Sequence, residues 1–344
     1  MALVLVLAAC LWGIGHLLRV PVLGRLLMIG LLYVAVLMVQ IAFPEGHALR
    51  NATGGSAGEW LVLGGLGAII WLYARGLKSL RTRIRPENKP QDRPSTSSTE
   101  LERNARHIVL REIGGPGQKR LKDARVLVIG AGGLGAPALQ YLAAAGVGTI
   151  GVIDHDIVEN SNLQRQVIHT DDRIGMPKVF SAETAMKAQN PFVTVRPYHR
   201  RLTSEIAAVL FADYDLVLDG TDDPATRYLV NETAVAAGLP LVSAAISQWE
   251  GQISIFDPSR GAPCYQCVFP EQPAPGLAPS CAEGGVLGPL PGVLGSMMAV
   301  EAIKLLAGAG EPLLGRMMIY DALYADVRVI GVKPRESCPI CGTK

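Results

Sequence analysis

The sequence predicts an α/β protein whose mainly parallel sheet has an antiparallel C-terminal extension and is preceded by transmembrane helices. Three observations predict this arrangement. The first 77 of the 344 residues are far more apolar than the rest. Between residues 101 and 246, helical patterns alternate with short apolar runs, which is typical of parallel strands joined by helices. Two later stretches, Gln252 to Asp257 and Arg316 to Ile330, are hairpin-like and indicate antiparallel pairing.

The N-terminal segment contains three apolar runs, at residues 2–18, 22–43 and 60–74. Each approaches the roughly 20 residues with which a helix crosses a bilayer. We therefore predict two or three transmembrane helices within residues 1–77. A cleaved signal is the alternative for the first run, because residues 7–10 (LAAC) resemble a lipoprotein cleavage site. No basic region precedes that run and further apolar runs follow it, which favours membrane helices.

Basic residues are unevenly distributed around these runs. They lie near the junction of the first two runs and after the third, whereas Arg50 alone lies between the second and third; the two groups are Arg19 and Arg25, and Arg75, Lys78, Arg81, Arg83 and Arg85. Because basic loops remain in the cytoplasm, three spans in the inner membrane would place the C-terminal domain on the cytoplasmic side. The second group is also suited to contact with anionic lipid.

Residues 78–99 form a basic, polar segment with several prolines and no apolar period, so we expect a flexible linker. The net charge of +2, with both signs interspersed, argues against nucleic acid as the main partner.

The soluble domain is expected to span residues 100–344 and to begin with a helix over 101–112. Each later helix is expected to follow a strand. The predicted pairs of strand and helix are 125–130 with 136–146, 149–154 with 177–189, 193–198 with 203–210, and 215–219 with 225–237, followed by a strand over 241–246. Residues 269–285 (FPEQPAPGLAPSCAEGG) are too rich in proline for a helix and too long for a tight turn, and such segments are usually functional or mobile.

Residues 125–135 (RVLVIGAGGLG) describe a strand, a glycine turn and a helix start, as in a Rossmann-like nucleotide site. The glycines Gly130, Gly132, Gly133 and Gly135 leave room for a phosphate at the helix N-terminus. Asp154 ends the next strand, 24 residues after Gly130, where an acid binds a ribose. Close packing of helix on strand is the alternative for the glycines, and capping of a loop is the alternative for Asp154.

Breaking a phosphoanhydride bond requires positive groups and usually a metal ion. The candidates are Arg165 in the loop after the second strand, Lys178 at a helix start and Asp222 just after the fourth strand. Each alone would be an ordinary surface charge. Together they follow the ends of successive parallel strands and therefore converge on the crevice where open sheets bind ligands.

Two C-x-x-C pairs, Cys264 with Cys267 and Cys338 with Cys341, have the spacing of a structural tetrahedral zinc site. Disulfides are the alternative, but a cytoplasmic domain is kept reduced. Cys281 stands alone in the proline-rich segment, where a lone cysteine is either a nucleophile or a small apolar side chain.

These motifs resemble those of the MoeB/ThiF/HesA adenylyltransferases, bacterial relatives of ubiquitin-activating enzymes, and most closely those of the MoeB branch. The resemblance covers residues 100–344 and rests on motifs in the same order: GAGGLG, SNLQRQ, G-x-P-K at 175–178, L-D-x-T-D at 218–222, both C-x-x-C pairs and EAIKLL at 301–306.

The resemblance implies that ATP and Mg²⁺ are used to adenylylate the C-terminal Gly-Gly carboxylate of a ubiquitin-like sulfur carrier of the MoaD type. That step activates the carrier for thiocarboxylate formation in molybdopterin cofactor biosynthesis. It further implies that the glycine turn and Asp154 hold the nucleotide, that Asn162, Arg165 and Lys178 stabilise the phosphates, and that Asp222 lies near the metal ion.

The resemblance also implies a homodimer in which Arg106 reaches the partner's site. Residues 269–285 resemble the family's crossover loop, and Cys281 matches a position where some relatives form a covalent link. No rhodanese-like segment follows Lys344, so a separate sulfur donor is expected.

Three departures from the family pattern stand out. Asn104 and His107 replace the tyrosine and glutamine of R-Y-x-R-Q, Asp223 replaces an asparagine, and the membrane segment has no counterpart. Three other functions remain open. The carrier could instead be of the ThiS type, from the thiamine pathway; the fold could belong to a nicotinamide or flavin oxidoreductase; or the chain could be a membrane-tethered carrier-binding protein without catalysis.

Overall fold

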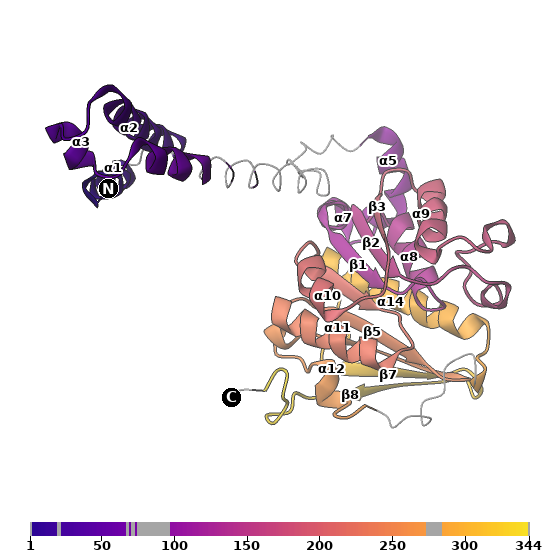
Figure 1. The fold of residues 1–344 in the computed structure, drawn as a ribbon. Helices are drawn as coiled ribbons and strands as arrows, with labels where there is room; N and C mark the ends of the chain where they lie inside the picture. The colour runs from indigo at the N-terminus through magenta and orange to yellow at the C-terminus, as the bar shows by residue number, and fades with distance from the viewer. Residues whose placement is uncertain are drawn as a thin grey trace. The chain divides into compact units, whose positions relative to one another are not determined.

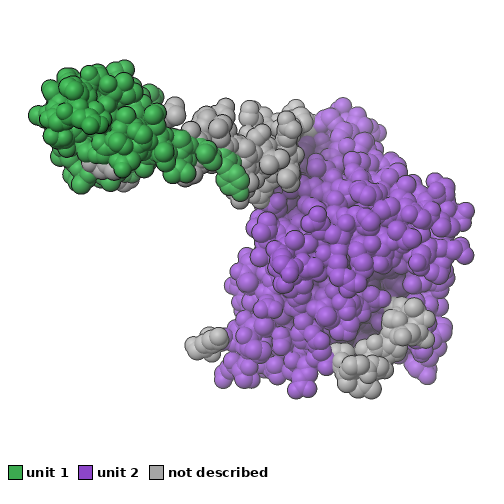
Figure 2. Space-filling model, in the orientation of Figure 1, with its two compact units in different colours: residues 1–94 green, residues 95–344 purple. Residues whose placement is uncertain are grey.

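The computed structural model describes residues 2–18, 22–66, 69, 73, 97–272 and 284–342. The chain divides into two compact units, Met1–Pro94 and Ser95–Lys344, which are distinguished by colour in Figure 2. Each unit has its own apolar core, so each is described by itself.

The N-terminal unit is helical. Helix α1 spans Ala2–Leu17, α2 spans Val22–Ala42, α3 spans Ala48–Thr53, and residues 57–66 are also helical. Its core is small, formed by Val4, Val36 and Trp60 with a few neighbours. Most of its large apolar side chains, such as those of Leu3, Leu5, Leu27 and Leu31, are instead exposed.

Polar contacts organise the turn between α2 and residue 57. Gln40, which is buried, donates a hydrogen bond from Nε2 to the hydroxyl of Thr53 at 2.8 Å. Arg50 donates from Nε to the Gln40 carbonyl oxygen at 3.2 Å, and the Trp60 indole donates to the Gly54 carbonyl at 2.9 Å. These hydrogen bonds give partners to polar groups that would otherwise lack them at the end of an apolar helix.

Two described helices are long and apolar enough to cross a membrane, Gly24–Ala42 within α2 and Pro289–Ala307. Half of the second is buried, and it packs in the core of the C-terminal unit. Helix α1 is shorter in its apolar part, Ala2–Gly15, and the run predicted at 60–74 lies partly outside the described residues.

The C-terminal unit contains one eight-stranded sheet with the order β3-β2-β1-β4-β5-β6-β7-β8 (Figure 1). Strands β1 to β5 are parallel, and β6, β7 and β8 continue the sheet antiparallel. This mixed sheet confirms the predicted α/β class. The strands are β1 (Arg125–Ile129), β2 (Thr149–Asp154), β3 (Thr194–His199), β4 (Leu216–Asp219), β5 (Leu241–Ile246), β6 (Glu250–Phe256), β7 (Arg316–Asp321) and β8 (Asp326–Gly331).

Helices cover both faces of this sheet. Alternate strand residues point to opposite faces, so Val126 and Val128 pack in one core with α8, α9 and α14, while Leu127 and Ile129 pack in the other with α10 and α11. The helices are α5 (Ser98–Arg103), α6 (Ala105–Ile108), α7 (Gly114–Asp123), α8 (Gly135–Ala144), α9 (Lys178–Gln189), α10 (Ser204–Phe211), α11 (Pro224–Ala237), α12 (Tyr265–Val268) and α14 (Pro289–Ala307).

The helix predicted over residues 101–112 is wrong in its extent. Helix α5 ends at Arg103, and α6 is a separate turn that ends at Ile108. Asn104 lies between them with non-helical backbone angles, is buried, and donates from Nδ2 to the Glu100 carbonyl at 3.1 Å. A short polar side chain that bonds the preceding turn competes with the helix, which explains the break at Asn104.

Helix α7 was not predicted, because its first residues, GGPG, resemble a loop. Gly114 enters the helix with φ of +58°, and Leu121 is fully buried in the core. Tertiary packing therefore offsets the poor helix propensity of this segment.

Candidate active site

The glycine turn follows β1 directly. Gly130 has φ of +92°, which permits the sharp turn, and its amide donates to the Ile153 carbonyl at 2.9 Å. A Cβ on Gly135 would lie 2.0 Å from the Gly130 carbonyl oxygen, so only glycine allows α8 to start so close to the strand. Gly135 thus lies beneath the turn, while Gly130, Gly132 and Gly133 line a cleft above it.

This cleft has a volume of about 880 Å³ and lies at the carboxyl ends of the parallel strands. Ligand sites commonly have volumes of about 300–1,000 Å³ and lie at this edge of open α/β sheets. Eight of the predicted nucleotide-site residues line it, namely Gly130, Gly132, Gly133, Asp154, Asn162, Arg165, Lys178 and Asp222. Residues that follow the ends of three strands, β1, β2 and β4, therefore converge as expected for strand ends.

Asp154 holds the glycine turn in place. One carboxylate oxygen accepts the amide of Ala131 at 2.8 Å and the other accepts the amide of Asp156 at 2.8 Å. This contact corresponds to the capping role that the sequence left open. Each carboxylate oxygen retains a further acceptor site, so the same side chain can also bind a ribose hydroxyl in the cleft.

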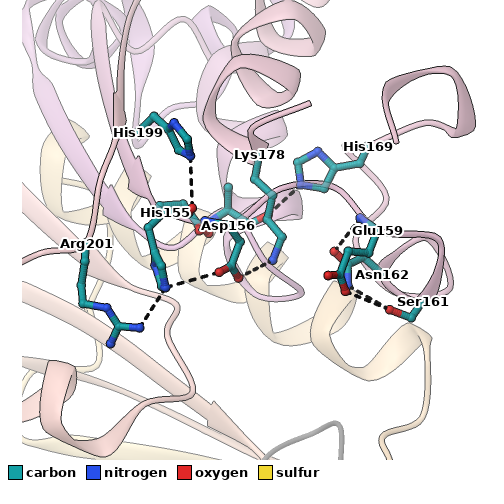
Figure 3. Close-up of polar contacts among 11 residues, drawn as sticks. His155, Asp156, Glu159, Ser161, Asn162, His169, Lys178, His199 and Arg201 are labelled. Carbon is teal, nitrogen blue, oxygen red and sulfur yellow. Dashed lines mark hydrogen bonds and ion pairs between the residues drawn. The ribbon is translucent and has the colours of Figure 1, made fainter. Parts of the chain in front are cut away.

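Lys178 begins α9 and is buried except at the cleft. Its ammonium group lies 2.8 Å from a carboxylate oxygen of Asp156, a contact drawn in Figure 3. Burial acts to raise the pKa of Asp156, but the hydrogen bond from Lys178 and the charges around the carboxylate together lower the pKa below the usual value. Asp156, which the sequence does not single out, therefore orients the Lys178 side chain. Its position two residues after Asp154 was the available signal.

The SNLQRQ segment adds a cation and an amide. Arg165 donates from Nη1 to the Ser161 carbonyl at 3.0 Å and lies along Gly133. Asn162 is buried, and its side-chain oxygen accepts the amide of Glu159 at 3.2 Å in a capping box. The Asn162 amide nitrogen has only a long contact to Ser161, at 3.5 Å, and remains able to donate to a ligand (Figure 3).

A second cationic wall was not predicted. Arg201 contacts His155 Nε2 at 2.9 Å, and His199 contacts the His155 carbonyl oxygen at 3.1 Å (Figure 3). Arg200, Arg201 and His155 line the cleft beside Asp154. The two arginines follow β3, so their place at a strand end was a usable signal.

The end of β4 carries a buried ion pair. Asp219 lies 3.2 Å from Arg227 Nη1 and also accepts hydrogen bonds from Ser243 and from the amide of Thr221. Arg227, missed by the sequence analysis, additionally donates to the Thr221 carbonyl. This network fixes the loop that presents Asp222, which is exposed at the cleft.

Asp223, a departure from the family pattern, is the N-cap of α11. Its carboxylate accepts the amide and the hydroxyl of Thr226, at 3.0 and 2.6 Å. The hydrogen bond from the Thr226 side chain lowers its pKa below the usual value. An asparagine caps helices equally well, so aspartate at this position keeps the cap that an asparagine would form.

The four predicted zinc ligands meet in one cluster. Cys264 is the N-cap of α12, Cys267 lies within that helix, and Cys338 and Cys341 come from the C-terminal segment. The four sulfurs all lie within 4.8 Å of one another. Ligands at about 2.3 Å from a tetrahedral zinc are separated by about 3.8 Å, and the closest pairs here lie at 3.3, 3.5 and 3.8 Å. All four are free cysteines, and three are buried. The donor set fits zinc.

Two predicted residues lie elsewhere. Arg106 is exposed on α6 and does not line the cleft of its own chain, and within the described ranges its guanidinium group has no hydrogen bond or ion pair. Cys281 lies outside the described residues.

A glycine turn, a carboxylate at the end of the next strand and a cation-lined cleft at the strand ends define a nucleotide-binding α/β protein. The chain belongs to the ThiF family, whose model matches residues 104–340. It is 51% identical over 247 residues to the sulfur carrier protein adenylyltransferase of Thermus thermophilus, which covers 71% of this chain and 91% of that protein. It is 48% identical over 248 residues to the SAMP-activating enzyme E1 of Haloferax volcanii, with 72% and 91% covered.

Other relatives are longer. The chain is 53% identical over 246 residues to the probable adenylyltransferase/sulfurtransferase MoeZ of Mycobacterium tuberculosis, of which it spans only 63%. Among solved structures, E. coli MccB with ATP superposes with a TM-score of 0.59 at 22% identity, over 66% of this chain and 70% of that one. At this identity the likeness shows the fold alone.

Proposed function

We propose that the protein uses ATP to adenylylate the C-terminal Gly-Gly carboxylate of a ubiquitin-like sulfur carrier of the MoaD type, which activates it for thiocarboxylate formation in molybdopterin cofactor biosynthesis. The observation that carries this proposal is the convergence of Arg165 and Lys178 on the glycine turn in a cleft large enough for a nucleotide and a peptide tail. The adenylyltransferase relatives support it.

In this reaction a carboxylate oxygen of the carrier attacks the α-phosphorus of ATP. A new oxygen–phosphorus bond forms, the bond to the β-phosphate bridging oxygen breaks, and pyrophosphate leaves with that electron pair. Both reactants are anions, so Arg165, Lys178 and the N-terminus of α8 offset their repulsion and the charge that develops on pyrophosphate. The attacking carboxylate is already ionised at neutral pH, so no general base is required.

Two metal ions would complete the protein, one in the cleft and one at the cysteine cluster. Asp222 presents an exposed carboxylate at the cleft, the kind of ligand that Mg²⁺ prefers beside substrate phosphates. That ion would neutralise phosphate charge. The four cysteines would hold a structural zinc that joins the C-terminal segment to α12.

We further propose a location for the chain, an oligomeric state and a source of sulfur. Residues 1–77 anchor the chain in the inner membrane, residues 78–99 form the linker, and residues 100–344 act in the cytoplasm; the apolar exterior of α1 and α2 supports this. The enzyme works as a homodimer in which Arg106 serves the partner's site, in keeping with its exposure and its place outside its own cleft. A separate donor supplies sulfur.

The decisive experiment is ATP–pyrophosphate exchange with the full chain in detergent. Purified MoaD-type and ThiS-type carriers would each be tested with and without the terminal glycine. We expect exchange with the intact MoaD-type carrier and none with its truncated form. Exchange with the ThiS-type carrier alone would reassign the substrate. Carrier binding without any exchange would instead identify a tethered binding protein.

A further inference from the structure

Tyr265 connects the two chemical centres of the C-terminal unit. It is the first residue of α12, between Cys264 and Cys267, which supply two of the four clustered sulfurs. Its own side chain lines the cleft. One short turn therefore belongs to both the cysteine cluster and the proposed active site.

The Tyr265 ring is fixed by its surroundings. It packs against Phe269 with ring centres 4.7 Å apart and meets Tyr228 and Phe256 edge-on, at 5.4 and 5.6 Å. Its backbone amide donates to the Asn231 side chain on α11 at 2.8 Å. The position of the hydroxyl is thus determined by α11 on one side and by the cysteine turn on the other.

The Tyr265 hydroxyl has no hydrogen-bond partner among the residues that the structure describes. Buried or half-buried tyrosines usually find one. The nearby charges of Arg227 and Asp219 already neutralise each other across 3.2 Å. The neighbouring Tyr228, by contrast, donates its hydroxyl to the Phe269 carbonyl at 2.8 Å and does not line the cleft. A free donor at a cleft wall is suited to a ligand.

The sheet order indicates which ligand the hydroxyl meets. Asp154, the ribose acid, ends β2, and the glycine turn follows β1. Ala245 and Ile246 line the cleft at the end of β5, three strands from β2 and therefore about 14 Å away. Tyr265 packs on the same side, against α11 and β6. The nucleotide occupies the β2–β1–β4 side, so the β5 side is left for the peptide tail.

We propose that Tyr265 binds the carrier tail, donating a hydrogen bond from its hydroxyl to a backbone carbonyl of the terminal glycines, and that the cysteine cluster sets the position of this hydroxyl. The proposal rests on the proposed function. It adds a tail-binding residue and makes the metal site a determinant of carrier affinity.

The first test compares Tyr265→Phe with the matched control Tyr228→Phe in the full chain. Both changes remove one hydroxyl and keep the ring. One neutral hydrogen bond contributes about 1 kcal/mol, so Tyr265→Phe should raise the KM for the carrier about fivefold and leave the KM for ATP unchanged. Tyr228→Phe should leave both KM values unchanged. A carrier KM unaltered in Tyr265→Phe, or a raised KM for ATP instead, would overturn the assignment.

The second test measures carrier binding directly, without nucleotide, before and after zinc is removed with a chelator. Metal removal should weaken binding to the wild-type chain by the same factor as Tyr265→Phe, with no further loss in that variant. Equal weakening of both chains would show that the cluster acts by another route. Absence of carrier-stimulated exchange in the wild type would reject the proposed function itself, whereas normal exchange in Tyr265→Phe rejects only this inference.

Discussion

At the residue scale, the charges of the cleft differ in how far other side chains already satisfy them. The Asp219 and Arg227 pair is buried and shapes the loop before Asp222. Lys178 is paired with Asp156, whose other side faces the exposed His155. Arg165 contacts only a backbone carbonyl in the described part of the chain. Its full charge is therefore offered to the cleft.

Replacing Arg165 or Lys178 with alanine should reduce adenylation by a factor on the order of a hundred, because each removes a cation aimed at developing negative charge. Steady-state pyrophosphate release with saturating carrier measures the loss. Lys119→Ala is the matched control, since that lysine forms an exposed ion pair with Asp123 and does not line the cleft. A loss below threefold in either cleft variant would contradict the assignment.

Asp223→Asn should fold and react normally, because asparagine retains the N-cap of α11, whereas Asp223→Ala should lose about 1 kcal/mol of stability. The lowered pKa of Asp223 adds a pH dependence. Its stabilising charge is present above the ordinary aspartate pKa and is lost as the pH falls through the lowered value.

Thermal unfolding of the wild type and Asp223→Asn measures this effect. The two midpoints should agree at neutral pH, and the wild-type midpoint should fall below that of Asp223→Asn at acid pH, where the carboxyl group is protonated. A constant difference across that range would show that the charge does not contribute.

At the element scale, the start of α8 depends on one close approach. A methyl group on Gly135 would meet the Gly130 carbonyl oxygen at 2.0 Å, whereas one on Gly132 would meet only the Gln166 side chain at 3.8 Å. The sequence singled out both as phosphate-site glycines, but their surroundings differ. One glycine fits the helix to the strand, and the other lines the cleft.

Gly135→Ala should therefore lower the midpoint of thermal unfolding by several degrees, consistent with a loss of about 1–3 kcal/mol on overpacking. Gly132→Ala should leave the midpoint nearly unchanged and raise the KM for ATP, because the added methyl group stands where phosphate approaches. Differential scanning calorimetry and exchange kinetics separate the two effects. Equal destabilisation of both variants would refute this division of roles.

At the scale of the whole molecule, we propose that a second copy of the chain completes the active site. Arg106 is exposed and stands apart from its own cleft. Arg106→Ala and Lys178→Ala should each be nearly inactive alone. When the two variants are mixed and allowed to exchange subunits, one site of each mixed dimer carries both native residues, so activity should return. Mixtures that stay inactive while forming mixed dimers would place Arg106 outside the partner's site.

The sequence by itself determined the α/β class, because strand patterns alternate with helical ones and the central strands β1 and β4 are buried. It also determined the glycine turn, the positions of Asp154, Arg165 and Lys178, and the cysteine pairing, because short motifs at strand ends encode local backbone chemistry. The prediction of one helix over residues 101–112 was wrong, because the Asn104 side chain donates a hydrogen bond to the Glu100 carbonyl and interrupts the helix.

Tertiary structure alone decided contacts between distant segments. These contacts are the ion pair of Asp219 with Arg227, the wall formed by His155 and Arg201, the ion pair of Asp156 with Lys178, and the place of Tyr265 between the cysteine cluster and the cleft. They join residues that no sequence spacing relates. The physical reason is that local propensity and periodicity act over a few residues, whereas side-chain pairing depends on how the strands order themselves in the sheet.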